Sequence, residues 1–259
     1  MVDVVRTVSE PARTARRTRP LGLLRAVGVV SGGPLALAVS SAVAPVSLLN
    51  RWPSRIRSPR VRRAAWAATG AGLVVPWVYL RVVRPYLQHW GATEEEQQAR
   101  LPGDTPDRKP LSVTTRAVTV EAPADEVWRW LVQIGQGRGG FYSYDWLENL
   151  AGCHIHSADR IEPELQHLAA GDELRLAPDF ATRFTEVDPP RSLVIENWGS
   201  YVVEPLDAGH SRLIARSHVD AGPGALGYYL AIELPHAVME RKMLLGIKRR
   251  AEKAAASAA

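Results

Sequence analysis

The sequence predicts an α+β protein, in which a curved antiparallel sheet surrounds a long C-terminal helix and an N-terminal membrane anchor precedes this domain. The first observation is the order of elements in the C-terminal half: one strand, two short helices, a run of strands and a last helix. The second is a pair of long uncharged segments among the arginines of the first ninety residues. With 259 residues, the chain has room for one ordinary domain and an additional segment.

Charge is distributed unevenly along the chain. Residues 1–90 contain fourteen arginines and two acidic residues, about +12, whereas the whole chain carries +5, so the remaining 169 residues sum to about −7. The arginines flank apolar stretches, an arrangement typical of segments that meet anionic lipid headgroups. We therefore expect a lipid bilayer as a partner and no nucleic acid. A disordered basic tail is the alternative.

Two segments are candidates for membrane-spanning helices. Residues 64–80 are uncharged and would form a helix of about 26 Å, close to the thickness of a thin hydrocarbon core. Trp66, Trp77 and Tyr79 lie near the ends of this segment, where interfacial aromatic residues are common. A buried core helix is the alternative. Residues 26–50 are also uncharged but contain several Gly and Pro residues, so a second span, an interfacial segment and a cleaved signal peptide all stay open.

These segments divide the chain into an anchor at residues 1–90, a linker at 91–110 and a domain at 111–259 that we expect to fold alone. The linker is polar and rich in proline, and Glu94–Glu96 could begin a short helix within it. We expect the protein in the plasma membrane of a bacterium. With one span, the arginines place the domain outside the cytoplasm; with two spans they decide nothing, so the orientation stays open.

Hydrophobic periodicity predicts the elements of the domain. Residues 114–121 alternate as a strand, with Val118 and Val120 on one face. A helix of about three turns follows, and a second short helix ends near Gly152. The last helix, from about residue 224, is expected to break or bend near Pro235. Five further strands are expected at residues 173–176, 184–187, 192–197, 201–205 and 211–219. This order of elements is that of a helix-grip fold.

Three segments resemble a known family: residues 115–131, which include Ala122-Pro-Ala-Asp-Glu-Val-Trp128, residues 135–150 and residues 239–250. The first is similar to the opening of SRPBCC domains (START-like, polyketide cyclase/dehydrase and lipid-transport), and the other two are similar to a membrane-anchored actinobacterial branch of that superfamily. The resemblance covers about residues 111–253. It implies a helix-grip fold whose sheet encloses an apolar cavity, and an apolar small molecule as ligand. It implies no catalytic residues, and we expect no cofactor.

Aromatic and small residues are the main candidates for the ligand site. Trp and Tyr combine a large apolar surface with one polar group, although core packing is the alternative for each of them. The small residues lie in the middle of one face of the last strand, where they leave space, while Arg216 and His218 point the opposite way. Four residues of the last helix, Leu230, Leu234, Val238 and Leu245, are expected to close the cavity. The predicted ligand contacts are Tyr142, Tyr144, Trp146, Trp198, Tyr201, Ala215 and Ser217, together with Glu196 and Arg138.

The polar candidates each have two interpretations. Glu196 either faces the cavity, where burial would raise its pKa and it could transfer protons, or lies exposed or in an ion pair. Arg138 lies in a glycine-rich stretch, and it either binds an acidic group of the ligand or belongs to a tight connection between helices. His154 and His156 could share one side of a strand, but no further ligands are apparent, so we expect no metal site. A structural polar network and contacts at the mouth of the pocket are the alternatives. Cys153 is the only cysteine and is expected to be a packed thiol.

Three classes of function agree with these observations. The first is the binding or carriage of an apolar small molecule, either a lipid or a polyketide-like compound. The alternatives are an enzyme on the same fold, of cyclase or dehydratase type, and an interaction module whose pocket has collapsed. A fold of this kind hosts all three, so the site must decide among them.

Overall fold

The computed structural model describes residues 77–105, 110–150 and 152–258, together with Arg60, Arg63, Ala67, Gly70 and Val74. The candidate span at residues 26–50 and most of the candidate span at 64–80 lie outside these residues. In the part of the chain that the structure describes, no helix has both the length and the apolar character that a membrane crossing requires.

Six antiparallel strands form one sheet in the order β1-β6-β5-β4-β3-β2, which confirms the α+β class. The strands are β1 (Ser112–Val120), β2 (Glu173–Ala177), β3 (Phe180–Asp188), β4 (Ser192–Ile195), β5 (Gly199–Pro205) and β6 (Ser211–Val219). β2, β3, β4 and β5 each pair with the next strand along the chain, whereas β1 pairs with β6 in the register that joins Ser112 to Val219 and Val120 to Ser211. The first and last strands of the domain therefore lie side by side.

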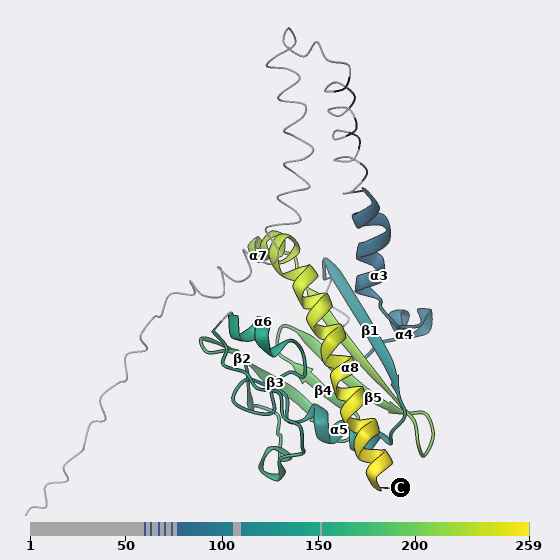
Figure 1. The fold of residues 1–259 in the computed structure, drawn as a ribbon, viewed down its shortest axis with the longest axis vertical. Coiled ribbons are helices and arrows are strands. Elements are labelled where there is room, and N and C mark those ends of the chain that lie inside the picture. Colours follow the sequence, from purple (N-terminus) through teal and green to yellow (C-terminus); the bar gives the residue numbers. More distant parts are fainter. Residues whose placement is uncertain are drawn as a thin grey trace, which may run out of the picture.

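The last helix crosses one face of this sheet, as the helix-grip prediction requires (Figure 1). It packs against β1 and α5. A π-helical turn precedes it at Tyr228–Ile232, and Pro235 lies in its first turn, where a missing N–H is tolerated. The helical elements are η1 (Tyr79–Val83), α3 (Arg84–Gln88), α4 (Glu94–Gln98), α5 (Ala124–Leu131), α6 (Asp145–Leu150), η2 (Pro163–Leu165), α7 (Pro223–Gly227), η3 (Tyr228–Ile232) and α8 (Glu233–Ala258).

The main core lies between the sheet and α8. Alternate residues of the strands contribute to it because successive side chains of a strand point to opposite faces. Val118 and Val120 of β1 and Leu213 of β6 are buried there against Leu131 of α5 and Leu244 of α8. Ala215 belongs to the same cluster. The predicted alternation along β1 and β6 is thus confirmed for these residues.

Residues 91–105, most of the predicted linker, pack on the opposite face of the sheet. The short helix suggested by Glu94–Glu96 is present as α4, and Thr93 and Glu96 form a capping box at its start. Leu101 is buried with the apolar residues of that face, Ala117, Val202 and Ile214. Asp104 accepts a hydrogen bond from buried Arg216 at 2.6 Å and lies 2.7 Å from His218 Nε2. The described part of this stretch is therefore packed against the domain.

Candidate functional site

A cavity of about 300 Å³ lies between α8, four strands of the sheet (β2 to β5) and the segment that follows α5. Most of the side chains around it are apolar or aromatic. The apolar and aromatic residues are Ile134, Phe141, Leu147, Leu174, Leu176, Ala177, Phe180, Ile195, Trp198, Tyr201, Ile232, Pro235, Met239 and Met243, and the others are Ser143, Glu148, Cys153, His236 and Glu240. A cavity of this composition suits a small apolar molecule that a few polar groups orient.

One face of α8 forms a wall of the cavity. His236, Met239, Glu240 and Met243 follow one another at intervals of three, one and three residues, so they share a side of the helix. The predicted lid of Leu230, Leu234, Val238 and Leu245 was wrong for the last three of these residues: Val238 is 41% exposed, and neither Leu234 nor Leu245 lines the cavity. Apolar residues occur around much of α8, so their spacing did not identify the inward face. The side chain of Leu230 lies outside the described residues.

A buried polar group lies at the part of the cavity near β1. Arg116 of β1 forms an ion pair with Glu240 of α8, and both side chains are almost fully buried. The ring of His236 is also bonded, through Nε2 to Glu240 Oε1 at 3.3 Å and through Nδ1 to the Tyr228 hydroxyl at 2.9 Å. Tyr201 donates a hydrogen bond to Glu240 at 3.5 Å.

This group holds Glu240 as a carboxylate. Burial favours the neutral acid, but His236 and Arg116 outweigh burial and lower the pKa of Glu240 to about 2. Burial, and then the charge of Glu240, raises the pKa of Tyr201 well above its ordinary value, so Tyr201 stays a neutral donor. Because a carboxylate can only accept, Nε2 of His236 is the donor to Glu240.

Glu148 is the other acidic residue in the cavity wall besides Glu240, and its environment is different. The residue is 5% exposed, and neither carboxyl oxygen has a hydrogen-bond partner among the described residues. Burial, and then the nearby charge of Asp145, raises the pKa of Glu148 to about 7. The thiol of Cys153 lies near this carboxyl, and its pKa is raised by burial and then by Glu148. Cys153 is free and buried.

Of the aromatic ligand contacts predicted from sequence, Trp198 and Tyr201 line the cavity. The rings of Trp198 and His236 pack edge to face, with 4.9 Å between the centroids. Tyr142 is buried elsewhere, while Tyr144 is half-buried beneath Lys242 and Trp146 is 68% exposed. None of these three lines the cavity. No observation tests ligand contact itself, so the role of each residue stays a prediction.

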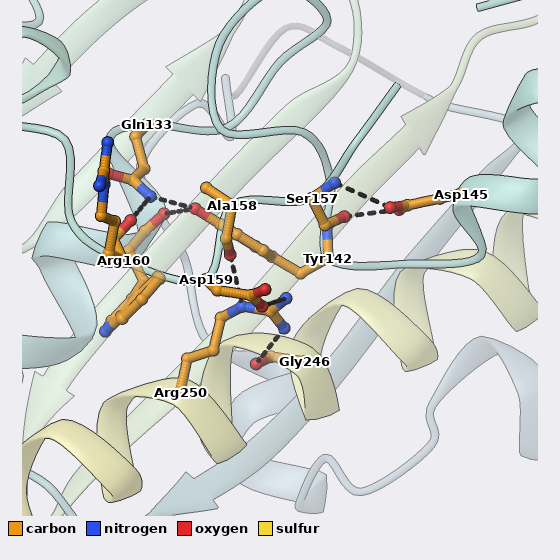
Figure 2. Close-up of polar contacts among 10 residues, drawn as sticks. Gln133, Tyr142, Asp145, Ser157, Ala158, Asp159, Arg160, Gly246 and Arg250 are labelled. Atoms are coloured by element: carbon orange, nitrogen blue, oxygen red, sulfur yellow. Dashed lines mark hydrogen bonds and ion pairs between the residues drawn. The ribbon is translucent and has the colours of Figure 1, made fainter. Parts of the chain in front are cut away.

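Tyr142 belongs to a structural network that crosses from α5 to α8. Its hydroxyl accepts from Gln133 at 2.8 Å and donates to the Trp130 carbonyl at 3.2 Å. Figure 2 shows Arg250 of α8 beside Tyr142, where it donates hydrogen bonds to the Ala158 carbonyl and the Asp159 carboxylate. The guanidinium of Arg250 also stacks on the Tyr142 ring at 4.7 Å. The loop after α5 is thereby tied to α8 and held beside the cavity.

The remaining predicted contacts also lie away from the cavity. Ala215 is fully buried in the core opposite Tyr201, and Ser217 is buried without lining the cavity. Glu196 is exposed, so its inward alternative was wrong and the exposed alternative holds. Arg138 donates to the carbonyls of Val132 and Leu165, as expected for a tight connection.

The predicted ligand contacts missed most of the cavity wall, and they also missed four charged or titratable residues of the site: Arg116, Glu148, His236 and Glu240. One signal was available for Arg116, since the alternation that pairs Val118 with Val120 extends back to Arg116. Another was the i, i+4 spacing of His236 and Glu240 on a helix. No local pattern marked Glu148 as buried. Among the described residues, no group of three or more side chains is arranged to hold a metal ion.

Comparison with known proteins gives structural likenesses only, because no family model and no curated protein matches the sequence. The structure is similar to the self-sacrificing resistance protein CalC from Micromonospora echinospora, at 11% identity over 56% of this chain and 96% of that chain, with a TM-score of 0.37. It is similar to the Zhui aromatase/cyclase from Streptomyces, at 20% identity over 55% and 94% of the two chains, with a TM-score of 0.30. A Polyketide_cyc-like protein from Corynebacterium glutamicum is 16% identical over 56% and 92%, with a TM-score of 0.29. Because the sequence identities and TM-scores are this low, the function of the chain follows from its own residues and not from these proteins.

Proposed function

We propose that this chain is a membrane-tethered protein that binds an apolar small molecule in the cavity beside α8. The observation that carries the proposal is the space of about 300 Å³ within a mostly apolar and aromatic wall. Ligand sites in proteins have volumes from about 300 Å³ and a similar composition. An interaction module with a collapsed pocket would have this space filled by side chains. The open volume therefore favours a binder over that alternative.

The membrane part of the proposal rests on the sequence and on one contact. The uncharged residues 64–80 end within η1, the π-helical turn that leads into α3, and Arg84 of α3 bonds Glu233 at 2.9 Å, where α8 begins. Ile232, the neighbour of Glu233, lines the cavity and is 38% exposed. A tether that ended at α3 would hold the cavity close to the bilayer, where apolar molecules are concentrated. The side of the membrane stays open.

Cavity filling tests the binding function. Ala177 lines the cavity on β2, so Ala177→Leu should place three further carbon atoms in the space, whereas Ala181→Leu makes the same change at an exposed position of β3. The full chain should be titrated with the neutral fluorescent probe N-phenyl-1-naphthylamine, with protein-free lipid or detergent as blank. Ala177→Leu should weaken probe binding at least tenfold and Ala181→Leu should not. Equal binding by both variants would overturn the proposal.

Membrane tethering needs a separate test. Cells that express the full chain should be fractionated, and the membranes washed with alkaline carbonate. We expect the full chain to stay in the pellet and a chain beginning at Gly91 to be released. Release of the full chain would contradict a spanning segment and leave the binding function untouched.

A second candidate function, acid–base catalysis on the bound molecule, is favoured by the Tyr228–His236–Glu240 chain of hydrogen bonds. Such a chain fixes the tautomer of a histidine that lines the cavity, a common feature of proton-transfer sites. Native mass spectrometry of the full chain and of His236→Asn, each with its co-purified molecule, separates the two functions. A pure binder should retain the same compound in both proteins. Different masses would indicate a reaction.

A further inference from the structure

The two carboxyl groups in the cavity wall, those of Glu240 and Glu148, differ in whether they have partners. The carboxylate of Glu240 is paired with Arg116 and bonded to His236. Glu148 differs: among the described residues, neither oxygen of its carboxyl group has a hydrogen-bond or ion-pair partner. A buried carboxyl without hydrogen bonds is costly, and each such group in a native structure needs an explanation. Here the group lies in the wall of a cavity that is large enough for a ligand.

Among the described residues, the charge that acts on Glu148 is negative. Asp145, one turn earlier on α6, accepts two hydrogen bonds from Ser157 at 2.8 and 2.6 Å and acts on Glu148 as a like charge. Cys153 follows α6 and is a neutral thiol, because its pKa is raised. The titratable groups that α8 contributes to the same wall, His236 and Glu240, are bonded to each other.

Aromatic rings form a large share of the same wall. Phe141, Phe180, Trp198 and Tyr201 all line the cavity. Phe141 packs against the small cluster that contains Cys153, and the Cys153 N–H donates to the Glu148 carbonyl at 3.1 Å. The faces of aromatic rings attract cations, and they do so more strongly where water is excluded. A carboxyl without a partner among aromatic rings is the combination that recognises an ammonium group.

We propose that the cavity selects a lipophilic amine, an apolar molecule whose protonated nitrogen pairs with Glu148. This inference rests on the proposed binding function, since it names the class of ligand for the same cavity. Apolar molecules with a carboxylate, such as fatty acids, would bring a second negative charge to Glu148 and are selected against. Neutral molecules of the same shape fit the apolar wall but leave the charge of Glu148 unmatched.

The pairing predicts a dependence on pH. The pKa of Glu148 is raised to about 7, so the group is mostly neutral at pH 6 and mostly ionised at pH 8. An amine that stays protonated over this range should therefore bind more tightly as the pH rises from 6 to 8. A neutral ligand should show no such gain, and a carboxylate should bind more weakly over the same range.

Three probes of nearly equal shape test the proposal: 1-naphthylmethylamine, 1-naphthalenemethanol and 1-naphthoic acid. Their binding to the purified full chain should be measured by calorimetry at pH 6, 7 and 8, with titrations into protein-free lipid or detergent subtracted. Glu148→Gln keeps the shape of the side chain and removes its charge. Glu164→Gln is the matched control, because Glu164 is exposed and does not line the cavity.

At pH 8 the amine should bind about tenfold more tightly than the alcohol and the acid more weakly than both, as expected for a hydrogen bond to a charged group. Glu148→Gln should remove the preference for the amine and its pH dependence, and should keep the affinity for the alcohol within about threefold. Glu164→Gln should behave as the wild type. Binding of the alcohol without a preference for the amine, or a preference that survives in Glu148→Gln, would overturn this inference and leave the binding function standing. Failure of all three probes to bind would overturn both.

Discussion

The ion pair between Arg116 and Glu240 provides the sharpest test of how the two halves of the domain are joined. Arg116 lies on the first strand and Glu240 on the last helix, and both side chains are almost fully buried. Glu240→Gln keeps the size of the side chain but leaves Arg116 as a buried charge without its counter-ion. Breaking a buried pair in this way costs about 3–5 kcal/mol. We expect a similar loss in the free energy of unfolding.

The pKa of Glu240 gives an independent magnitude. The pKa lies at about 2 in the folded protein and at 4.5 ordinarily, so the folded state favours the carboxylate. Since one pKa unit corresponds to 1.36 kcal/mol, the environment of this charge contributes about 3 kcal/mol at neutral pH. A lowered pKa means that this contribution is present above pH 4.5 and is lost as the pH falls from 4.5 to 2. The disadvantage of Glu240→Gln should shrink over the same window.

Thermal unfolding of the full chain, followed by tryptophan fluorescence, measures this effect. A loss of about 3 kcal/mol should lower the melting temperature by roughly 6–12 °C for a domain of this size. Glu186→Gln, at an exposed position of β3, is the control and should change it little. If Glu240→Gln melts within 2 °C of the wild type at pH 7, the buried pair does not stabilise the fold as argued. A difference that stays constant down to pH 3 would contradict the electrostatic origin.

Three other changes test the packing and electrostatics of the domain. Gly246→Ala should destabilise it strongly, because a Cβ there would lie 2.3 Å from the Tyr142 carbonyl oxygen, whereas Gly227→Ala meets nothing within 4 Å and should be tolerated. Glu148→Gln should raise the free energy of unfolding at pH 8 by up to about 3 kcal/mol and change it little at pH 4. The reason is that Glu148 has a pKa of about 7 in the folded protein, so its ionisation destabilises the wild-type fold as the pH rises from 4.5 to 7. A chain beginning at Leu111 should be less stable than one beginning at Tyr79 by about 3 kcal/mol or more, because buried Arg216 loses Asp104 and the Ala99 carbonyl.

Thermal and urea unfolding measure all three, and each has an outcome that contradicts it. Equal melting of Gly246→Ala and Gly227→Ala would show that α8 does not press on the loop at Tyr142. A stability gain in Glu148→Gln that is the same at pH 4 and pH 8 would exclude ionisation as its cause. Equal stability of the two shortened chains would mean that residues 79–110, including those packed on the sheet at 91–105, do not stabilise the domain.

Much of the fold could be predicted because it depends on local periodicity. Alternation along β6 assigned Ala215 and Ser217 to one face and Arg216 and His218 to the other, since a strand repeats every two residues. The order of the elements then led to the helix-grip arrangement. Along α8 the same approach selected the wrong face. Apolar residues such as Leu234 and Met239 occur on different sides of that helix, so periodicity alone does not determine which side meets the sheet.

The candidate site was far less predictable, because its residues meet only in three dimensions. The sequence by itself determined the α+β class, the faces of the strands and Trp198 and Tyr201 as residues near a cavity. Only the tertiary structure decided that Arg116 meets Glu240 across 124 positions of sequence, and that Glu148 is buried without a partner. The physical reason is that burial and charge pairing depend on which elements pack together, whereas a sequence pattern reports only the geometry within one element.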